Sequence, residues 1–361
     1  MEDTVVFLCT KNELNRERQG YFKAFSSQIN TICISYEKLY LSDRIDELIP
    51  SKINPILAIH ADSWPRLLPQ GLTTTTYPTA CFQIDTFEYP QARAEFSQLF
   101  DYVFVFHPGY DHKFAQFGHP NSYVLPHAVD ADMFTTQQLK RIYDVGWVGR
   151  LDGNKYSLRR KCIKQLHHRY QMNNIERYYS PSEMATVYQQ SKIVVNLSRD
   201  DYLQDANLRC FEAMAGGALL ITPKPTELSA IGFVEGVHYV AFEDQSELLS
   251  KVEYYLKHEQ EREAIAQSSQ KLVLGKHTYN VRAKTILDII KSHSNQLFAP
   301  AREWDSVTVC QQYFKYFCRC FMLNEAFTEL KKIHQFQPLK AHASSLLLLK
   351  ALAIKFRDSL N

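Results

Sequence analysis

The feature that most constrains the fold is a series of short apolar runs with consecutive Val, Ile, Leu and Phe residues. Strands with one face in water alternate apolar and polar residues, so continuous runs predict strands that are covered on both faces, as in a parallel sheet. Amphipathic segments between the runs have the spacing of helices. The first half therefore predicts an α/β layered domain. Its apolar runs lie at 4–9, 31–36, 55–60, 79–85, 102–107 and 122–127, with helical segments at 18–29 and 89–100.

The second half repeats this alternation. A chain of 361 residues is long for one hydrophobic core, so two domains are the natural expectation. The polar segment 128–141 separates the halves. We predict two Rossmann-like domains that face a cleft, at residues 1–134 and 135–298. In the second half, strands are predicted at 144–150, 192–198, 218–222 and 238–243, and helices at 157–170, 182–191, 207–217 and 245–275.

The last part of the chain, residues 299–361, has a different character. Residues 307–333 and 339–360 predict two helices with aromatic and Leu-rich faces, separated by a segment that contains Pro338. We expect a helical hairpin that packs on the second domain or serves self-association.

Composition excludes several classes of function. Lys and Arg number 41 against 39 Asp and Glu, a net charge of +2, so charge gives no reason to expect nucleic acid or an anionic membrane as a partner. Apolar runs are too short to span a bilayer, and the N-terminus is acidic where a signal peptide is basic, so we expect a cytoplasmic protein. Cys318 and Cys320 form a C-x-C pair without a second pair nearby, which is weak evidence for metal.

One candidate anion site follows the first strand of the second half. In "DVGWVGRLDGNKYSLRRK" an apolar strand leads through Gly149 and Arg150 to a loop with Lys155 and then to a helix with Arg159. Cations and loop amides at a strand-to-helix connection are what a diphosphate requires. A solvated basic helix start is the alternative explanation.

The stretch "NLRCFEAMAGGALLIT" (207–222) is a second candidate. Asn207 is a suitable helix N-cap, whereas Arg209 lies near the positive end of the helix dipole and calls for a nearby anion. Glu212 interrupts an otherwise apolar helix face, and the vicinal hydroxyls of a ribose could donate to its carboxylate. The Gly216–Gly217 pair allows a sharp turn into the next strand.

These residues carry a resemblance to a known family. The stretch at 207–222, the "VGR" with Lys155, "FEDQSELLSKVEYYL" and "HTYNVRA" resemble the donor half of GT-B glycosyltransferases of the glycosyl transferases group 1 type, in particular the CgeB-like (spore-maturation type) group. The resemblance covers roughly residues 55–290, and "FEAMAGGALLIT" is its most specific part.

The resemblance implies transfer of a sugar from a nucleotide diphosphate sugar, with a UDP-sugar as the first choice. It implies that Glu212 holds the ribose and that Arg150 and Lys155 neutralise the diphosphate, without a metal or other cofactor. Asp130-x-Asp132 looks like a metal-binding pair but falls in the interdomain connection. The sequence departs from the retaining pattern at Gln204, where those enzymes carry a second Glu, and it lacks the glycine-rich loop after the first strand.

An acceptor hydroxyl in an inverting reaction would need a general base in the first domain. Candidates at predicted strand ends are His60, Asp62, Asp85 and His107, and Asp85 is the first choice because it closes the apolar run "ACFQI". The acceptor itself is unknown: protein, glycan, lipid and nucleobase all stay open. Two other functions also stay open, a catalytically inactive nucleotide-sugar-binding scaffold and a sugar-nucleotide epimerase on the same fold.

Overall fold

A computed structural model describes residues 2–8, 16–34, 44–61, 70–134, 139–294, 296–319 and 322–338, together with 341, 344, 345 and 347. The chain forms two compact units. The first contains residues 1–18, 25–125 and 286–361, and the second contains residues 19–24 and 126–285. Residues 286–298, which we expected in the second domain, are therefore grouped with the first unit.

The first unit is built on a parallel sheet with the strand order β2-β1-β3-β4-β5-β6. Each predicted apolar run of the first half supplies one strand, and the sheet is parallel as predicted, although the order of the strands was not predicted. The strands are β1 (Glu2–Leu8), β2 (Asn30–Ile34), β3 (Ile53–His60), β4 (Thr79–Gln83), β5 (Tyr102–Val105) and β6 (Ser122–Val124). The connecting helices are α1 (Arg16–Ser26), α2 (Ile45–Leu48), α3 (Pro90–Ser97) and α4 (Tyr110–Gln116), with a 3-10 turn, η3, at Leu72–Thr74.

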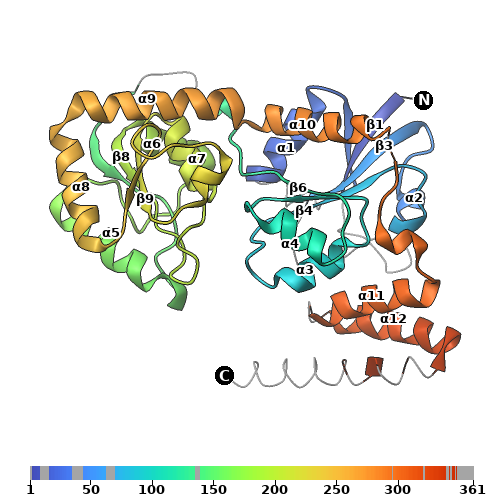
Figure 1. The fold of residues 1–361 in the computed structure, drawn as a ribbon. Coiled ribbons are helices and arrows are strands. Elements are labelled where there is room, and N and C mark those ends of the chain that lie inside the picture. The colour runs from blue at the N-terminus through green and yellow to red at the C-terminus, as the bar shows by residue number, and fades with distance from the viewer. Residues whose placement is uncertain are drawn as a thin grey trace. The chain divides into compact units, whose positions relative to one another are not determined.

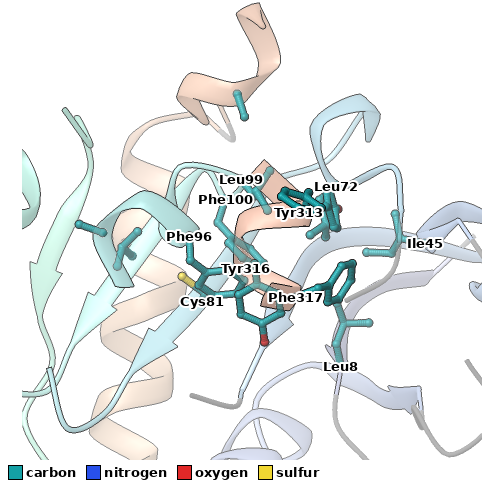
Figure 2. Packing of buried hydrophobic residues seen from close by; sticks show 14 of the residues in the cluster. Leu8, Ile45, Leu72, Cys81, Phe96, Leu99, Phe100, Tyr313, Tyr316 and Phe317 are labelled. Atoms are coloured by element: carbon teal, nitrogen blue, oxygen red, sulfur yellow. The ribbon is translucent and has the colours of Figure 1, made fainter. Parts of the chain in front are cut away.

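The C-terminal helices complete the core of this first unit. Figure 2 shows Tyr313, Tyr316 and Phe317 buried in the same cluster as Leu8 of β1 and Phe96 of α3. The rings of Phe96 and Tyr316 stack with centroids 4.6 Å apart. Burial of such large rings supplies much of the stability of a core of this size.

This position corrects our expectation that the extension packs on the second domain. The predicted helix 307–333 is also interrupted, because it consists of α11 (Ser306–Arg319) and α12 (Leu323–Phe336), which pack against each other. The amide of Met322 bonds to the carbonyl of Phe317 at 2.9 Å in the connection. The break lets both helices turn apolar faces into the core. The second predicted helix, 339–360, lies almost entirely outside the described residues, as does Cys320 of the C-x-C pair.

The second unit has a parallel sheet in the order β10-β9-β8-β7. Figure 1 labels its strands β8 and β9, together with the helices α5, α6, α7, α8 and α9 of the same unit. Every strand predicted there is present. The strands are β7 (Tyr143–Gly146), β8 (Ser191–Val195), β9 (Leu219–Pro223) and β10 (Val240–Phe242). The helices are α5 (Ser157–Arg169), α6 (Pro181–Gln189), α7 (Leu208–Ala215), α8 (Gln245–Lys257) and α9 (Glu259–Lys276), with 3-10 turns η4 (Ala131–Met133), η5 (Asn154–Tyr156) and η6 (Glu227–Ile231). Helix α10 (Tyr279–Ser292) begins in this unit, and its residues from 286 onward are grouped with the first unit.

Both faces of this second sheet are covered, as the continuous apolar runs predicted. Along β8, Val194 lies in the cluster with residues of α6 and α7, while Ile193 and Val195 lie in the cluster with residues of α5 and α8. The predicted helix 245–275 divides at His258, where φ is −106° and ψ is 70°. This division lets α8 cover one face of the sheet while the end of α9 covers the other.

Helix α10 was not predicted and follows α9 directly; a further 3-10 turn, η7 (Pro300–Glu303), precedes α11. None of the described helices combines the length and the apolar character that a bilayer-spanning segment needs.

Candidate functional site

The N-terminus of α7 is organised by asparagine side chains at the end of β8. Asn207 is the N-cap, and its Oδ1 accepts from the amide of Arg209 at 3.1 Å, as the sequence predicted. Its Nδ2 donates to Asn196 Oδ1 at 3.1 Å and to Ser198 Oγ at 2.6 Å. Asn196 is fully buried and donates in turn to Thr222 Oγ1 at 3.1 Å. The network fixes the first turn of α7 against the carboxyl end of β8.

Arg209 extends from this turn toward the end of β7. Its Nε donates to the carbonyl of Val148 at 2.9 Å and its Nη1 to Asn196 Oδ1 at 2.8 Å. The guanidinium lies 5.7 Å from the ring centre of Trp147. A Cβ at Gly149 would lie 2.6 Å from Arg209 Nη2, so the position requires glycine for the guanidinium to approach. The Gly149 that our sequence analysis placed in the loop thus makes room for a cation.

Arg159 enters the same region from α5. Its Nε donates to the carbonyl of Leu197 at 2.7 Å and its Nη1 to that of Arg150 at 2.9 Å. The guanidinium also lies 4.0 Å from the ring centre of Tyr156. Arg159 is 6% exposed. It therefore joins the loop after β7 to the loop after β8.

The positive charge of Arg209 acts on the guanidinium of Arg159. Burial, and then the positive charge of Arg209, lower the pKa of Arg159 to about 10. Within the described part of the chain neither guanidinium has a carboxylate partner within ion-pair distance, and the hydrogen bonds that each donates go to main-chain carbonyls and to Asn196. Buried charges are normally paired. The carboxylates of Asp205 and Asp200 act on Arg159 in the opposite direction and raise its pKa. Binding of an anion with more than one negative charge at the two guanidiniums stays a prediction.

Arg150 and Lys155 lie at the same loops but point outward. The side chain of Arg150 is 70% exposed, and its Nε lies 3.5 Å from Asp152 Oδ1. Lys155 Nζ lies 3.6 Å from Asp201 Oδ2, with both side chains about half exposed. Exposed pairs of this kind are weak and are easily exchanged for another anion. Their contact with a diphosphate stays a prediction.

The N-terminus of α5 does not offer the loop amides that we expected. Asp200 accepts there from the amide of Ser157 at 2.7 Å and from that of Leu158 at 3.3 Å. The chain's own carboxylate therefore satisfies these donors. The predicted anion site at Arg159 and Arg209 therefore does not use the amides of Ser157 and Leu158.

Glu212 lies on α7 and is 5% exposed. The neighbours Phe211, Ala213 and Met214 are fully buried in the core. Glu212 lies one helical turn from the N-terminal turn that carries Arg209. Its contact with a ribose stays a prediction.

The base candidates of the first unit have different surroundings. His60 is fully buried at the end of β3, between Phe100, whose ring stacks at 5.8 Å, and Phe96 at 5.9 Å, so its position is that of a core histidine. Asp62 lies outside the described residues. His107 is 1% exposed beyond the end of β5, with its ring edge-on to Phe87 at 5.2 Å.

Asp85 is the candidate that lies exposed, just beyond the end of β4. It adopts a left-handed backbone conformation with φ of 52°. An exposed carboxylate at the carboxyl end of a parallel strand has the position that a base for an acceptor hydroxyl requires.

The other residues singled out from the sequence have structural explanations. Lys23 Nζ lies 3.2 Å from Asp130 Oδ2 and 2.7 Å from Asp132 Oδ2, so an ammonium group pairs with both carboxylates. Gln204 is exposed, and its carbonyl accepts from the amide of Glu227 at 2.9 Å.

Our sequence analysis missed the part played by Asn196. It ends the apolar run "KIVVN", and a buried amide that closes a strand is a signal that could have been read. Trp147 was missed as well, because a tryptophan inside an apolar strand is first read as core.

The comparisons with known proteins bear on the same unit. Residues 134–288 match a protein-family model described as glycosyl transferase-like. No curated protein matches the sequence. Among solved structures, HepE of Anabaena in complex with UDP-glucose is similar over 80% of this chain and 99% of its own, at 12% identity and a TM-score of 0.54.

Two further solved structures agree. Sucrose-phosphate synthase of Thermosynechococcus elongatus covers 81% of this chain and 99% of its own at 10% identity, with a TM-score of 0.56. A glycosyltransferase of Rickettsia africae covers 81% and 98% at 13% identity, with a TM-score of 0.54. The chain has the GT-B fold. The family-model match at 134–288 covers α7 and the Arg159–Arg209 pair.

Proposed function

We propose that this GT-B protein is a glycosyltransferase that takes a sugar from a nucleotide diphosphate sugar, with a UDP-sugar as the preferred donor. The observation that carries the proposal is the Arg159–Arg209 cation pair, which lies at the carboxyl ends of parallel strands and for which the described residues supply no carboxylate at ion-pair distance. Ligands of such sheets bind at that edge. The match of residues 134–288 to the glycosyl transferase-like model and the UDP-glucose bound in the Anabaena structure support this choice of anion.

The donor would be held as follows. Arg209 and Arg159 compensate the diphosphate charge, and Asn207 keeps the start of α7 in place. Glu212 accepts from the ribose hydroxyls. Arg150 and Lys155 exchange their exposed carboxylate partners for phosphate oxygens. Because these side chains supply the positive charge, we propose that no divalent metal or other cofactor is needed.

The transfer step needs a base for the acceptor. In our proposal the Asp85 carboxylate takes the proton from an acceptor hydroxyl while the oxygen of that hydroxyl bonds to the anomeric carbon of the donor sugar. The bond from that carbon to the diphosphate oxygen breaks, and the nucleoside diphosphate leaves with the electron pair. His107 is the second candidate for this role.

Three narrower proposals rest on the sequence. The stretch at 207–222 favours the CgeB-like group within the GT-B proteins. A cytoplasmic location is the second proposal, and fractionation of cells that express the chain would test it. Self-association through the C-terminal helices is the third, and light scattering of the purified chain would detect it.

Donor turnover tests the proposed function directly. The purified chain is incubated with UDP-, GDP-, ADP- and TDP-sugars, with and without cell extract, and nucleotide release is measured in buffer with EDTA. We expect release from one class of donor, and retention of activity in EDTA. Failure to bind or turn over any donor would refute the proposal. Binding without release would indicate a scaffold, and a changed sugar still attached to its nucleotide would indicate an epimerase.

A further inference from the structure

The turn after β4, residues 85–89, has a strained backbone. Asp85 and Tyr89 have φ values of 52° and 53°, and in the described part of the chain only Ser294 among the other non-glycine residues has positive φ. Side chains other than glycine rarely adopt this conformation, and strain of this kind persists where the surroundings enforce it, often at functional sites. Two such residues in one short turn call for an explanation.

A buried arginine enforces the conformation. Arg93 of α3 is 4% exposed, and its Nε donates to the carbonyl of Glu88 at 2.7 Å. Its Nη1 donates to Gln83 Oε1 at the end of β4, at 3.2 Å. The amide of Glu88 donates to the carbonyl of Asp85 at 2.9 Å, and the amide of Arg93 donates to the carbonyl of Tyr89 at 3.0 Å. The turn is therefore held from both of its ends.

The turn presents two complementary groups to solvent. The carboxylate of Asp85 is exposed, and the side chain of Tyr89 is 70% exposed, the second largest value among the large hydrophobic residues of the described chain. Between them, Thr86 is fully buried, and its hydroxyl has no hydrogen-bond partner among the described residues. A buried hydroxyl without a partner is unfavourable unless a ligand or solvent completes it.

We propose that the 85–89 turn binds the acceptor and that the acceptor is a sugar or glycan. This inference rests on the proposed function and names the acceptor class for it. A sugar ring has an apolar face of C–H groups that packs on an aromatic ring, and hydroxyls that donate to a carboxylate. Tyr89 supplies the ring and Asp85 the carboxylate. Arg93 is a positioning residue that keeps both directed outward.

Glycoside binding without any donor tests the inference separately from donor turnover. The probes are the p-nitrophenyl α- and β-glycosides of glucose, galactose, mannose and N-acetylglucosamine, and binding to the full chain is measured by saturation-transfer difference NMR. We expect at least one of them to bind. Tyr89→Gly should weaken this binding about tenfold, and Tyr89→Phe should retain it.

The variant Tyr89→Gly also distinguishes a functional from a structural tyrosine. Glycine adopts positive φ without strain, so its melting temperature should equal or exceed that of the wild type while glycoside binding falls. Tyr178→Ala is the matched control, because Tyr178 is 88% exposed and has no positive φ; binding should be unchanged there.

Two results would overturn the inference. One is that none of the glycosides binds the wild type, as expected for a peptide or lipid acceptor. The other is that Tyr89→Gly binds as well as the wild type. Neither result changes the outcome expected in the donor assay. A chain that binds glycosides but turns over no nucleotide sugar would refute only the proposed function.

Discussion

Asp101 and Arg302 form a two-point ion pair, with Arg302 Nε 2.7 Å from Asp101 Oδ1 and Arg302 Nη2 2.7 Å from Asp101 Oδ2. The carboxylate is fully buried and also accepts from the amides of Thr79, Phe298 and Ala299, at 2.8, 2.8 and 2.9 Å. Bidentate pairs of this geometry are among the stronger charge-assisted contacts. This pair fastens the segment before α11 to the sheet of the first unit.

We predict that Arg302→Ala lowers the free energy of unfolding by about 3–5 kcal/mol, because it leaves a buried carboxylate without its counter-ion. Urea unfolding followed by circular dichroism measures the change. The control is Arg319→Ala, whose partner Glu95 lies at 2.8 Å but whose own side chain is 38% exposed. That variant should cost less than about 1 kcal/mol. Equal losses in the two variants would contradict the assignment of Asp101 as the anchor.

A substitution at Gly149 tests the role of the Arg159–Arg209 cation pair in binding the donor. Gly149→Ala places a Cβ 2.6 Å from Arg209 Nη2, so the guanidinium has to move from its place beside Val148 and Asn196. The same Cβ lies 3.0 Å from the ring of the buried Trp147, so we expect some loss of melting temperature as well. UDP affinity, measured by calorimetry, should fall about tenfold. The double variant with Arg209→Ala should lose little more than Arg209→Ala alone, because both changes act on one guanidinium.

Gly275→Ala is the control for this experiment. A Cβ at Gly275 meets no atom within 4 Å, and the residue lies in α9. UDP affinity should be unchanged, and helix propensity should raise the free energy of unfolding by up to about 1 kcal/mol. Additive losses in the Gly149→Ala and Arg209→Ala double variant would mean that Gly149 acts in another way.

The strands were predictable because their signal is local. A run such as 192–198 contains the consecutive apolar residues 193–195, and β8 is buried on both faces. The location of the C-terminal helices was not predictable in this way. The aromatic face of α11 shows that Tyr316 must be buried, but the sequence does not say that its partner is Phe96, far away along the chain.

In the candidate site, too, features of one helix were predictable and contacts between distant segments were not. The N-cap role of Asn207 and the need of Arg209 for an anion follow from the pattern of one helix. The link from Arg159 to the carbonyl of Leu197 crosses between two loops, and the capping of α5 by Asp200 does the same. Contacts between distant segments depend on how the strands are ordered, which residue type and spacing do not specify.

Glu212 allows a test of the ribose contact. Glu212→Ala should weaken UDP binding about 10- to 100-fold, because charge-assisted hydrogen bonds are lost. A 2′,3′-dideoxy analogue of UDP has no vicinal hydroxyls, so the wild type and the variant should bind it equally. Calorimetry with both nucleotides separates this result from a general loss of affinity. If the variant weakens both ligands to the same extent, Glu212 supports the helix rather than the ribose.

His277 makes the stability of the second unit depend on pH. Its Nδ1 accepts from Arg282 Nη2 at 2.6 Å, and its ring lies 4.9 Å from that of Phe233, so the neutral form is the one that fits. Burial, followed by the charges of Arg282 and Lys276, lowers the pKa of His277 from 6.5 to about 3. Between these values the unfolded chain binds the proton and the folded chain does not.

The contribution of His277 is therefore complete above pH 6.5 and is lost as the pH falls toward 3. We expect it to add about 1 kcal/mol per pH unit to the slope of unfolding free energy against pH in this window. His277→Gln removes the titrating group, and the difference between the wild-type and variant slopes isolates it from His119, whose pKa is also lowered, to about 4, by burial. Urea unfolding at pH 7.5, 6.5, 5.5 and 4.5 measures both slopes. Parallel curves would show that His277 is solvated or already protonated in the folded chain.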